Sequence, residues 1–226
     1  MHSKPGSPNN NRIYDGMEHL ILCEGMDEWK FITEYLNSKA VADYPEISQK
    51  IQVENFGGNE ELPTKLQLWI KAPGFDHIKT LVVIRDAEKN AEQAVGNIIS
   101  AMNKAQLHCP NQPGKLEHGE KLTTGFLLFP TLSADLIDGT LEDLCISILK
   151  ESEKETLWEI EEFLNHLEER SLRFFTWKFK TKLHTFFSVT NEYVSLKIGE
   201  AATAGAFDWY SPCLQEFKTF LLEMIK

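Results

Sequence analysis

The sequence predicts an α/β fold, in which a four-strand parallel sheet is flanked by helices and followed by a helical C-terminal extension. Four short runs of aliphatic and aromatic residues, each bounded by polar residues or glycine, have the composition of strands buried on both faces. Longer segments with apolar residues at helical spacing separate these runs, as in parallel α/β sheets. From residue 139 onward the strand-like runs disappear and the helical spacing continues, which predicts the extension.

Strands and helices alternate along residues 17–138, which we predict to be the α/β core. The strands are expected at 20–23, 51–55, 81–84 and 125–129, and the helices at 27–38, 59–70 and 91–107. Asn59 is a suitable N-cap for the second helix, and Pro63 falls in its first turn, where proline is tolerated. The polar segment 108–122 contains proline and glycine and is expected to be a loop.

Two segments are expected outside this core. Residues 1–16 are rich in Asn, Pro, Ser and Gly and have little to bury, so we expect a disordered N-terminal segment. Residues 139–226 are expected to form a helical extension packed on the core. Its helices are predicted near 141–149, 157–167, 172–187 and 214–225. A chain of 226 residues with 42% hydrophobic content suits one such domain with an extension.

Composition narrows the functional classes. The formal charge is -11, from 23 basic and 34 acidic residues, which disfavours broad electrostatic binding to nucleic acid and restricts any such contact to a local patch. The four cysteines are widely spaced without a C-x-x-C pair, so neither a zinc knuckle nor a disulfide framework is indicated. No apolar run approaches the ~18 residues of a membrane span. We therefore expect a cytoplasmic protein with no membrane partner.

Three acidic residues follow predicted strands at the point where each strand ends. Glu24 comes after the first strand, and Asp86 and Glu88 come after the third. The carboxyl ends of parallel strands meet at one edge of the sheet, where open α/β sheets bind ligands. Residues two apart in an extended chain point the same way, so Asp86 and Glu88 should project together, with Glu24 across from them if the two strands are neighbours. Carboxylates this close need a counter-charge, which Mg²⁺ or Mn²⁺ supplies.

Each of these acids also has a simpler interpretation. Acidic residues just past a strand commonly cap the following helix or lie in a solvated loop. For Glu24 the next residue is Gly25, which permits a close backbone approach at a strand-to-helix turn. Taken one at a time, the acids fit either interpretation, and their joint placement favours the cation.

Four short segments in this order resemble the Toprim superfamily, and more narrowly the stand-alone Toprim-like proteins related to OLD-family nucleases. These segments are Cys23–Asp27, Arg85–Glu88, Gly139–Leu144 and Lys197–Asp208, and the resemblance extends from residue 18 to about residue 220. It implies Mg²⁺- or Mn²⁺-dependent phosphodiester chemistry on DNA or RNA.

The resemblance also implies roles for individual residues. Glu24 matches the family's glutamate that binds metal or acts as general acid or base, and Asp86 with Glu88 matches its Asp-x-Asp metal motif, with Glu in place of the second Asp. Glu142 and Asp143 are candidate ligands of a second ion, although acids in the first turn of a helix are also favoured by the helix dipole. Lys182 and Lys197 are both candidates to neutralise charge on the phosphate.

The segment 170–182 is the most basic part of the chain. Five basic residues alternate there with four aromatic ones, a mixture that pairs phosphates and stacks on bases. The alternative is an ordinary core-facing stripe of a helix, made by Leu172, Phe175, Phe179 and Leu183, with Lys178 and Lys182 in solvent.

Two functions of different classes remain open from the sequence. The first is a metal-dependent nuclease or related phosphotransferase with Glu24, Asp86 and Lys197 as its catalytic residues. The second is a catalytically silent Toprim-like module that binds or regulates a partner protein. The chain has no G-x-x-x-x-G-K-[ST] motif, so any ATPase would be a separate partner. DNA and RNA are equally compatible as substrates.

Overall fold

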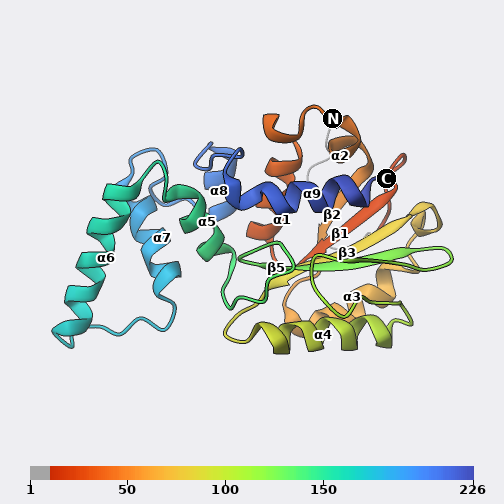
Figure 1. The fold of residues 1–226 in the computed structure, drawn as a ribbon, viewed down its shortest axis with the longest axis horizontal. Coiled ribbons are helices and arrows are strands. Elements are labelled where there is room, and N and C mark those ends of the chain that lie inside the picture. The colour runs from red at the N-terminus through yellow and green to blue at the C-terminus, as the bar shows by residue number, and fades with distance from the viewer. Residues whose placement is uncertain (1–10) are drawn as a thin grey trace.

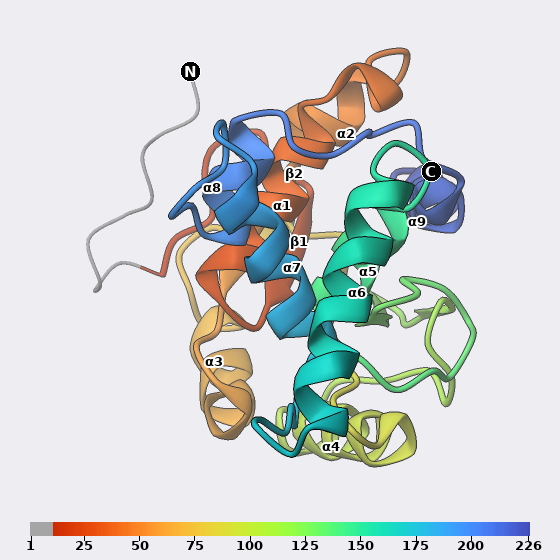
Figure 2. The ribbon, with the colours of Figure 1, turned by 90° about the vertical axis from the view of Figure 1, so that its left-hand side faces the viewer.

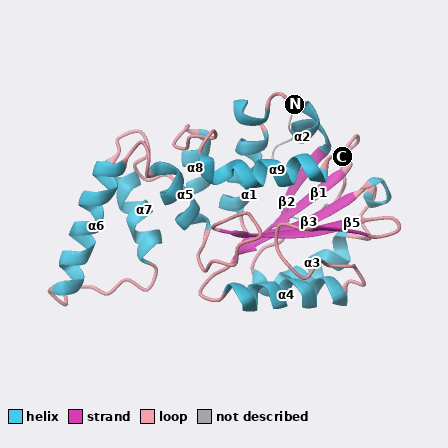
Figure 3. Cartoon of the chain, in the orientation of Figure 1, coloured by secondary structure: helices cyan, strands magenta, loops and turns pink. Residues whose placement is uncertain are grey.

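The structure is a computed structural model and describes residues 11–226; the expected disorder of residues 1–10 lies outside this range. Its centre is a five-stranded sheet in the order β2-β1-β3-β5-β4 (Figures 1 and 3). The strands are β1 (His19–Cys23), β2 (Ile51–Asn55), β3 (Thr80–Asp86), β4 (Leu116–His118) and β5 (Thr123–Phe129). The α/β prediction with four parallel strands is confirmed, and β1 and β3 are neighbours.

The fifth strand differs from the prediction. β4 pairs antiparallel with β5 at the edge of the sheet, inside the segment expected to be a loop. It has only three residues and none is buried, so it carries no hydrophobic pattern. Its place is set by the hairpin that leads into β5.

Helices cover both faces of the sheet (Figure 1). One face packs against α3 (Leu62–Trp69) and α4 (Ala91–Lys104). The opposite face is covered by α1 (Met26–Leu36), α2 (Pro45–Lys50), α5 (Leu141–Leu149), α8 (Ile198–Thr203) and α9 (Gln215–Met224). Alternation along the strands separates the two cores: in β1, Leu20 and Leu22 face the α3–α4 side, whereas Ile21 and Cys23 face the α1 side.

Residues 139–226 contain helices and no strand, as the sequence predicts. The helices α6 (Lys154–Glu169) and α7 (Lys178–Val189) pack on one another and project beyond the sheet, as Figures 1 and 2 show. α9 then returns onto the sheet. The six-residue helices α2 and α8 were not predicted, because less than two turns is too short to show a helical period.

The core-facing stripe predicted for 172–187 is wrong in its first half. α6 ends at Glu169, Ser171 takes a left-handed conformation with φ of 52°, and no helix resumes before Lys178. Leu172 and Phe179 are therefore exposed instead of buried. Phe175 packs partly buried against the core, and Leu183 is fully inside it.

The expectation that residues up to 16 lie outside the fold does not hold for the described part. Ile13 is buried in the core on the α3–α4 side of the sheet, and its amide donates to the Pro73 carbonyl at 3.1 Å. The Tyr14 amide donates to Gln52 Oε1 at 2.9 Å. One apolar side chain among polar neighbours is too weak a pattern to predict this packing. Within residues 11–226 every helix is too short or too polar to cross a membrane.

We predict that His19 makes the protein sensitive to acid. His19 is buried at the start of β1, its Nδ1 has no hydrogen-bond partner, and this burial lowers its pKa from 6.5 to about 4. The folded protein favours the neutral ring. Its contribution to the free energy of unfolding is therefore complete above pH 6.5 and is lost as the pH falls toward 4. We expect a loss of about 2 kcal/mol after allowing for solvent screening.

The check is denaturant unfolding at pH 7.5, 6, 5 and 4 for the wild type and His19→Leu. The variant should lose less stability across this range, because it has no ring to protonate. Equal pH slopes for the two proteins would contradict the assignment.

Candidate functional site

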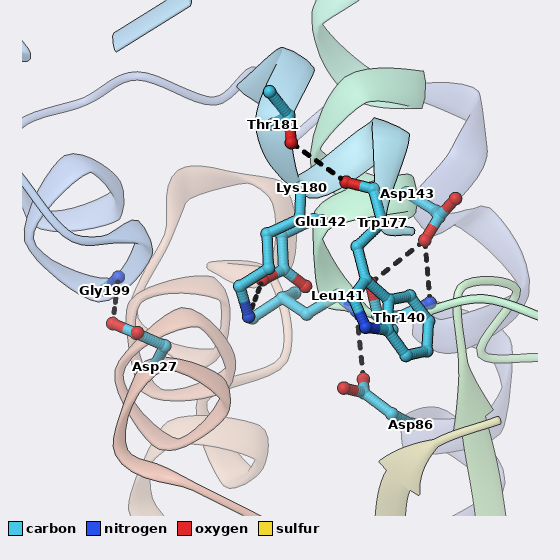
Figure 4. A network of polar contacts seen from close by, with 10 residues as sticks. All are labelled: Asp27, Asp86, Thr140, Leu141, Glu142, Asp143, Trp177, Lys180, Thr181 and Gly199. Carbon is cyan, nitrogen blue, oxygen red and sulfur yellow. Dashed lines mark hydrogen bonds and ion pairs between the residues drawn. The ribbon is translucent and has the colours of Figure 1, made fainter. Parts of the chain in front are cut away.

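The carboxyl ends of β1 and β3 meet the N-termini of two helices. β1 leads through Glu24 and Gly25 into α1, and the Asp86 carboxylate at the end of β3 accepts a hydrogen bond from the Leu141 amide, 2.9 Å from Oδ1, at the start of α5 (Figure 4). The positive end of the α5 dipole and its free amides favour a carboxylate at this position. These contacts fix Asp86 against α5 on the α1 side of the sheet.

A cavity of about 370 Å³ opens beside Asp86. Its acidic lining residues are Asp27, Glu28, Asp86, Glu142 and Glu200, and its basic ones are Lys30, Lys180 and Lys197. Some of the acids have structural roles, because Asp27 accepts from the Gly199 amide at 2.9 Å and Glu200 from the Lys197 amide at 3.0 Å. Glu28 and Glu142 are the lining acids whose charges act on Asp86, so we take Glu28, Asp86 and Glu142 as the candidate ligands. We call this space the acidic cavity.

The carboxylates around the acidic cavity interact strongly with one another. Burial raises the pKa of Asp86 well above its usual range, and the charges of Glu28, Glu142 and Glu24 raise it further against the opposing hydrogen bond from Leu141. Burial also raises the pKa of Glu28 to about 6, with Glu24, Asp27 and Glu142 adding to the shift. The cavity is thus a place where added positive charge is favoured.

Glu28 reaches the cavity because Gly25 has no side chain. A Cβ at position 25 would lie 2.6 Å from Glu28 Oε2, so the carboxyl group folds back over the glycine at the start of α1. Gly25 thus permits a close approach at the strand-to-helix turn, as the sequence analysis suggested. The sequence analysis did not select Glu28; its signal was an acid in the first helical turn after a glycine.

Glu142 lies on the first turn of α5 and is paired with Lys180 of α7, with Nζ 2.8 Å from Oε1 (Figure 4). Burial opposes the charged form of Glu142, but the hydrogen bonds from Lys180, Thr140 and its own backbone, together with the charge of Lys180, outweigh burial and lower its pKa. The same contact raises the pKa of Lys180. Lys180 was not selected from the sequence, although it belongs to the basic segment 170–182.

Lys197 lines the same cavity from the start of α8. α8 lies close against α1: a Cβ at Gly199 would meet Lys30 Cβ at 2.6 Å, so only glycine fits there. Lys197, expected from the sequence to neutralise charge on a phosphate, thus lies beside the candidate ligands, and its catalytic role stays a prediction. Lys182, by contrast, is buried and pairs with Glu161 at 2.5 Å, outside the lining of the cavity.

Glu24 does not lie in the acidic cavity. The register pairs Cys23 with Ile84, so the residue after Cys23 matches Arg85, and both side chains point to the α3–α4 side, away from Asp86. Glu24 Oε2 is 3.8 Å from Arg85 Nε and has no hydrogen bond. The predicted arrangement of Glu24 directly across from Asp86 is wrong by one residue of register.

Glu88 does not project with Asp86 either. The extended conformation ends at Asp86, and Glu88 is left-handed with φ of 59°. Its backbone exchanges two hydrogen bonds with Gly139, at 2.8 and 2.7 Å. The Glu88 side chain lines a different cavity, together with Arg85. The two-residue alternation assumed for this pair does not apply once the strand has ended.

Asp143 caps α5 and lies away from the acidic cavity. Its Oδ2 accepts from the Thr140 amide at 2.8 Å and from the Thr140 hydroxyl at 3.0 Å. This capping box is the simpler alternative that the sequence left open.

The donor chemistry of the acidic cavity fits a hard divalent cation, because it offers several carboxylates whose charges oppose one another. The geometry is not that of a complete ligand set: among residues 11–226, no three His, Cys, Asp or Glu side chains are arranged to hold a metal ion. Glu28, Asp86 and Glu142 are the residues that would hold one.

Comparison with known proteins gives one family. The family described as "Protein of unknown function (DUF3226)" matches residues 18–226. The searches of curated proteins and of solved structures gave no match.

We predict that Glu28 lowers stability at neutral pH. Its folded-state pKa of about 6 lies above the ordinary 4.5, so folding favours the protonated form. The protein therefore loses stability as the pH rises from about 4.5 to about 6, by about 2 kcal/mol from this group. Glu28→Gln should be more stable than the wild type by that amount at pH 7 and equal to it near pH 4.

Chemical denaturation at pH 4, 5, 6 and 7 checks this prediction. Glu159→Gln, on the exposed face of α6, is the matched control and should follow the wild type. The prediction fails if Glu28→Gln and the wild type keep the same stability difference at every pH.

Proposed function

The chain belongs to the family described as "Protein of unknown function (DUF3226)", and we propose that it performs divalent-metal-dependent phosphodiester chemistry on nucleic acid, as a Toprim-like nuclease or related phosphotransferase. The observation that carries this proposal is that the side chains of Asp86, Glu28 and Glu142 line one cavity at the carboxyl ends of the parallel strands. Such edges are the usual ligand sites of open α/β sheets. The mostly parallel sheet with helices on both faces is compatible with the resemblance to Toprim proteins.

A cation is the first requirement of this proposal. Glu28, Asp86 and Glu142 are the proposed ligands, which replaces the set of Glu24, Asp86, Glu88, Glu142 and Asp143 expected from the sequence. Bound Mg²⁺ or Mn²⁺ would polarise a phosphoryl oxygen and lower the pKa of a bound water. Glu24, on the opposite face, contributes negative charge that raises the pKa of Asp86.

The two lysines of the acidic cavity suit a phosphate group. Lys180 and Lys197 both line it, and ammonium groups beside a phosphate neutralise the charge that develops during transfer. Lys180 is half-exposed, and within residues 11–226 its ion-pair partner is Glu142, so an incoming phosphate competes with Glu142 for it. The cavity thus combines cation ligands with partners for a phosphate.

We expect the wild type to nick plasmid DNA or cleave single-stranded DNA or RNA in Mg²⁺ or Mn²⁺, and to lose the activity in EDTA. Glu28→Gln and Asp86→Asn should each reduce the rate at least about 100-fold, because each removes a proposed ligand. Glu159→Gln, on the exposed surface of α6, should retain the wild-type rate. Wild-type activity no higher than that of the two cavity variants would overturn the proposal.

A catalytically silent module is the second candidate. Two ion pairs favour it: Lys180 with Glu142 and Arg85 with Glu24 already compensate part of the acidic charge. In this case the fold would bind or regulate a partner protein, such as a separate ATPase.

Titration calorimetry with Mn²⁺ separates the two candidates. For the enzyme we expect a dissociation constant of about a millimolar or lower, weakened at least about tenfold by Asp86→Asn. Binding weaker than millimolar, together with a stable protein complex in a pull-down, would favour the module.

A further inference from the structure

A second hollow lies across the sheet edge from the acidic cavity, on the α3–α4 side. It consists of two cavities of about 370 and 310 Å³ that share Arg85 and Asn97. Lys89 and Trp177 line the first, and Lys104 lines the second. Since they share two lining residues, we treat them as one groove along α4 and call it the Arg85 groove.

Arg85 is the buried charge of this groove. Its side chain is only 3% exposed, and its Nε donates to the Asp86 carbonyl at 3.1 Å. Glu24 is 3.8 Å from the same Nε, and no residue within 11–226 accepts a hydrogen bond from the two terminal amino groups. A buried guanidinium with unused donors is a strong partner for an anion such as phosphate, which it can bind through two hydrogen bonds.

Trp177 and Lys89 stand at one end of the groove. Lys89 Nζ lies 4.7 Å from the centroid of the Trp177 ring, and the ring is 39% exposed. Trp177 belongs to the aromatic and basic segment 170–182 and comes directly before α7. Phe174 in the same segment is 80% exposed. An exposed aromatic ring beside a cation offers a stacking platform for a base next to a partner for its phosphate.

The charge of the groove differs from that of the whole protein. Arg85, Lys89 and Lys104 line it with two acids, Glu60 and Glu88, and Glu24 lies 3.8 Å from Arg85 Nε, so the charges here balance, whereas the chain as a whole carries -11. The groove therefore repels a polyanion less than the protein as a whole does, and the unused donors of Arg85 favour a phosphate there.

The groove and the acidic cavity are joined by neighbouring residues. Arg85 and Asp86 are adjacent in β3 and point to opposite faces, one to each site. Trp177 precedes α7 and Lys180 lies in its first turn, so α7 also contributes to both sites (Figure 4). A strand held in the groove would thus pass over the sheet edge to the acidic cavity.

From these observations we propose that the Arg85 groove binds single-stranded nucleic acid, with one base stacked on Trp177 and the adjacent phosphate held by Arg85 and Lys89. The inference rests on the proposed function in that the strand bound here is the substrate of the acidic cavity. Stacking on an aromatic ring requires an unpaired base, which distinguishes a single strand from a duplex.

Fluorescence anisotropy of labelled 12-nucleotide oligo(dT) and oligo(U), in EDTA and with the full chain, tests the groove without any cleavage. Trp177→Ala should weaken binding about tenfold or more, and Trp177→Phe should restore most of it, because a phenyl ring still stacks. Lys89→Gln should weaken binding and reduce the slope of log affinity against log salt by about 0.7. Arg85 is left unchanged because its loss would leave Glu24 buried without a partner.

Trp158→Ala and Lys121→Gln are the matched controls, since they remove an exposed tryptophan and an exposed lysine outside the groove. They should bind like the wild type. Asp86→Asn should also bind like the wild type or more tightly, because it lies outside the groove. A wild type that binds the oligonucleotides but does not cleave them would count against the proposed function alone. Equal affinities of Trp177→Ala and Trp158→Ala, or tighter binding of a 12-base-pair duplex than of either oligonucleotide, would overturn the inference.

Discussion

The hydrogen bond from the Leu141 amide to the Asp86 carboxylate connects the end of β3 to the start of α5, and the rest of the candidate site is arranged around it. It holds a carboxylate where burial and the neighbouring acids oppose its charge. Because α5 is fixed by this contact and by its own capping box, Glu142 is brought beside Asp86 and within reach of Lys180. One backbone amide thus joins the sheet to the helices that complete the cavity.

The electrostatic character of the molecule changes across a single strand. On one face Asp86 lies among carboxylates with a net demand for positive charge. On the other face Arg85, its neighbour in sequence, is buried with the Glu24 carboxylate 3.8 Å away and with unused donors. The alternation of a β-strand is sufficient to separate these two environments, although the residues are joined by one peptide bond. A ligand that spans the sheet edge meets both.

The sequence was sufficient to predict the four parallel strands, because each is a short apolar run that is typical of a sheet covered by helices on both faces. It also located Asp86, Glu142 and Lys197 of the acidic cavity. Glu24 and Glu88 were misplaced for geometric reasons: the register pairs Glu24 with Arg85, and the left-handed backbone at Glu88 ends the alternation. Glu28 and Lys180 could not be ranked above other charged helical residues from the sequence. Glu28 reaches the cavity because its side chain folds back over Gly25, and Lys180 reaches it because α7 approaches α5.

The attachment of α6 and α7 has a mechanical consequence. These two helices pack on each other and project from the body of the protein, with Trp177 and Lys180 within one helical turn at the base of α7. α7 also packs on α5, and its residues Leu183, Phe186 and Phe187 lie in the main core. The distance between the indole and the ammonium group is therefore set by the packing of one helix against the body of the protein, and so is the spacing between the two proposed contacts of a strand.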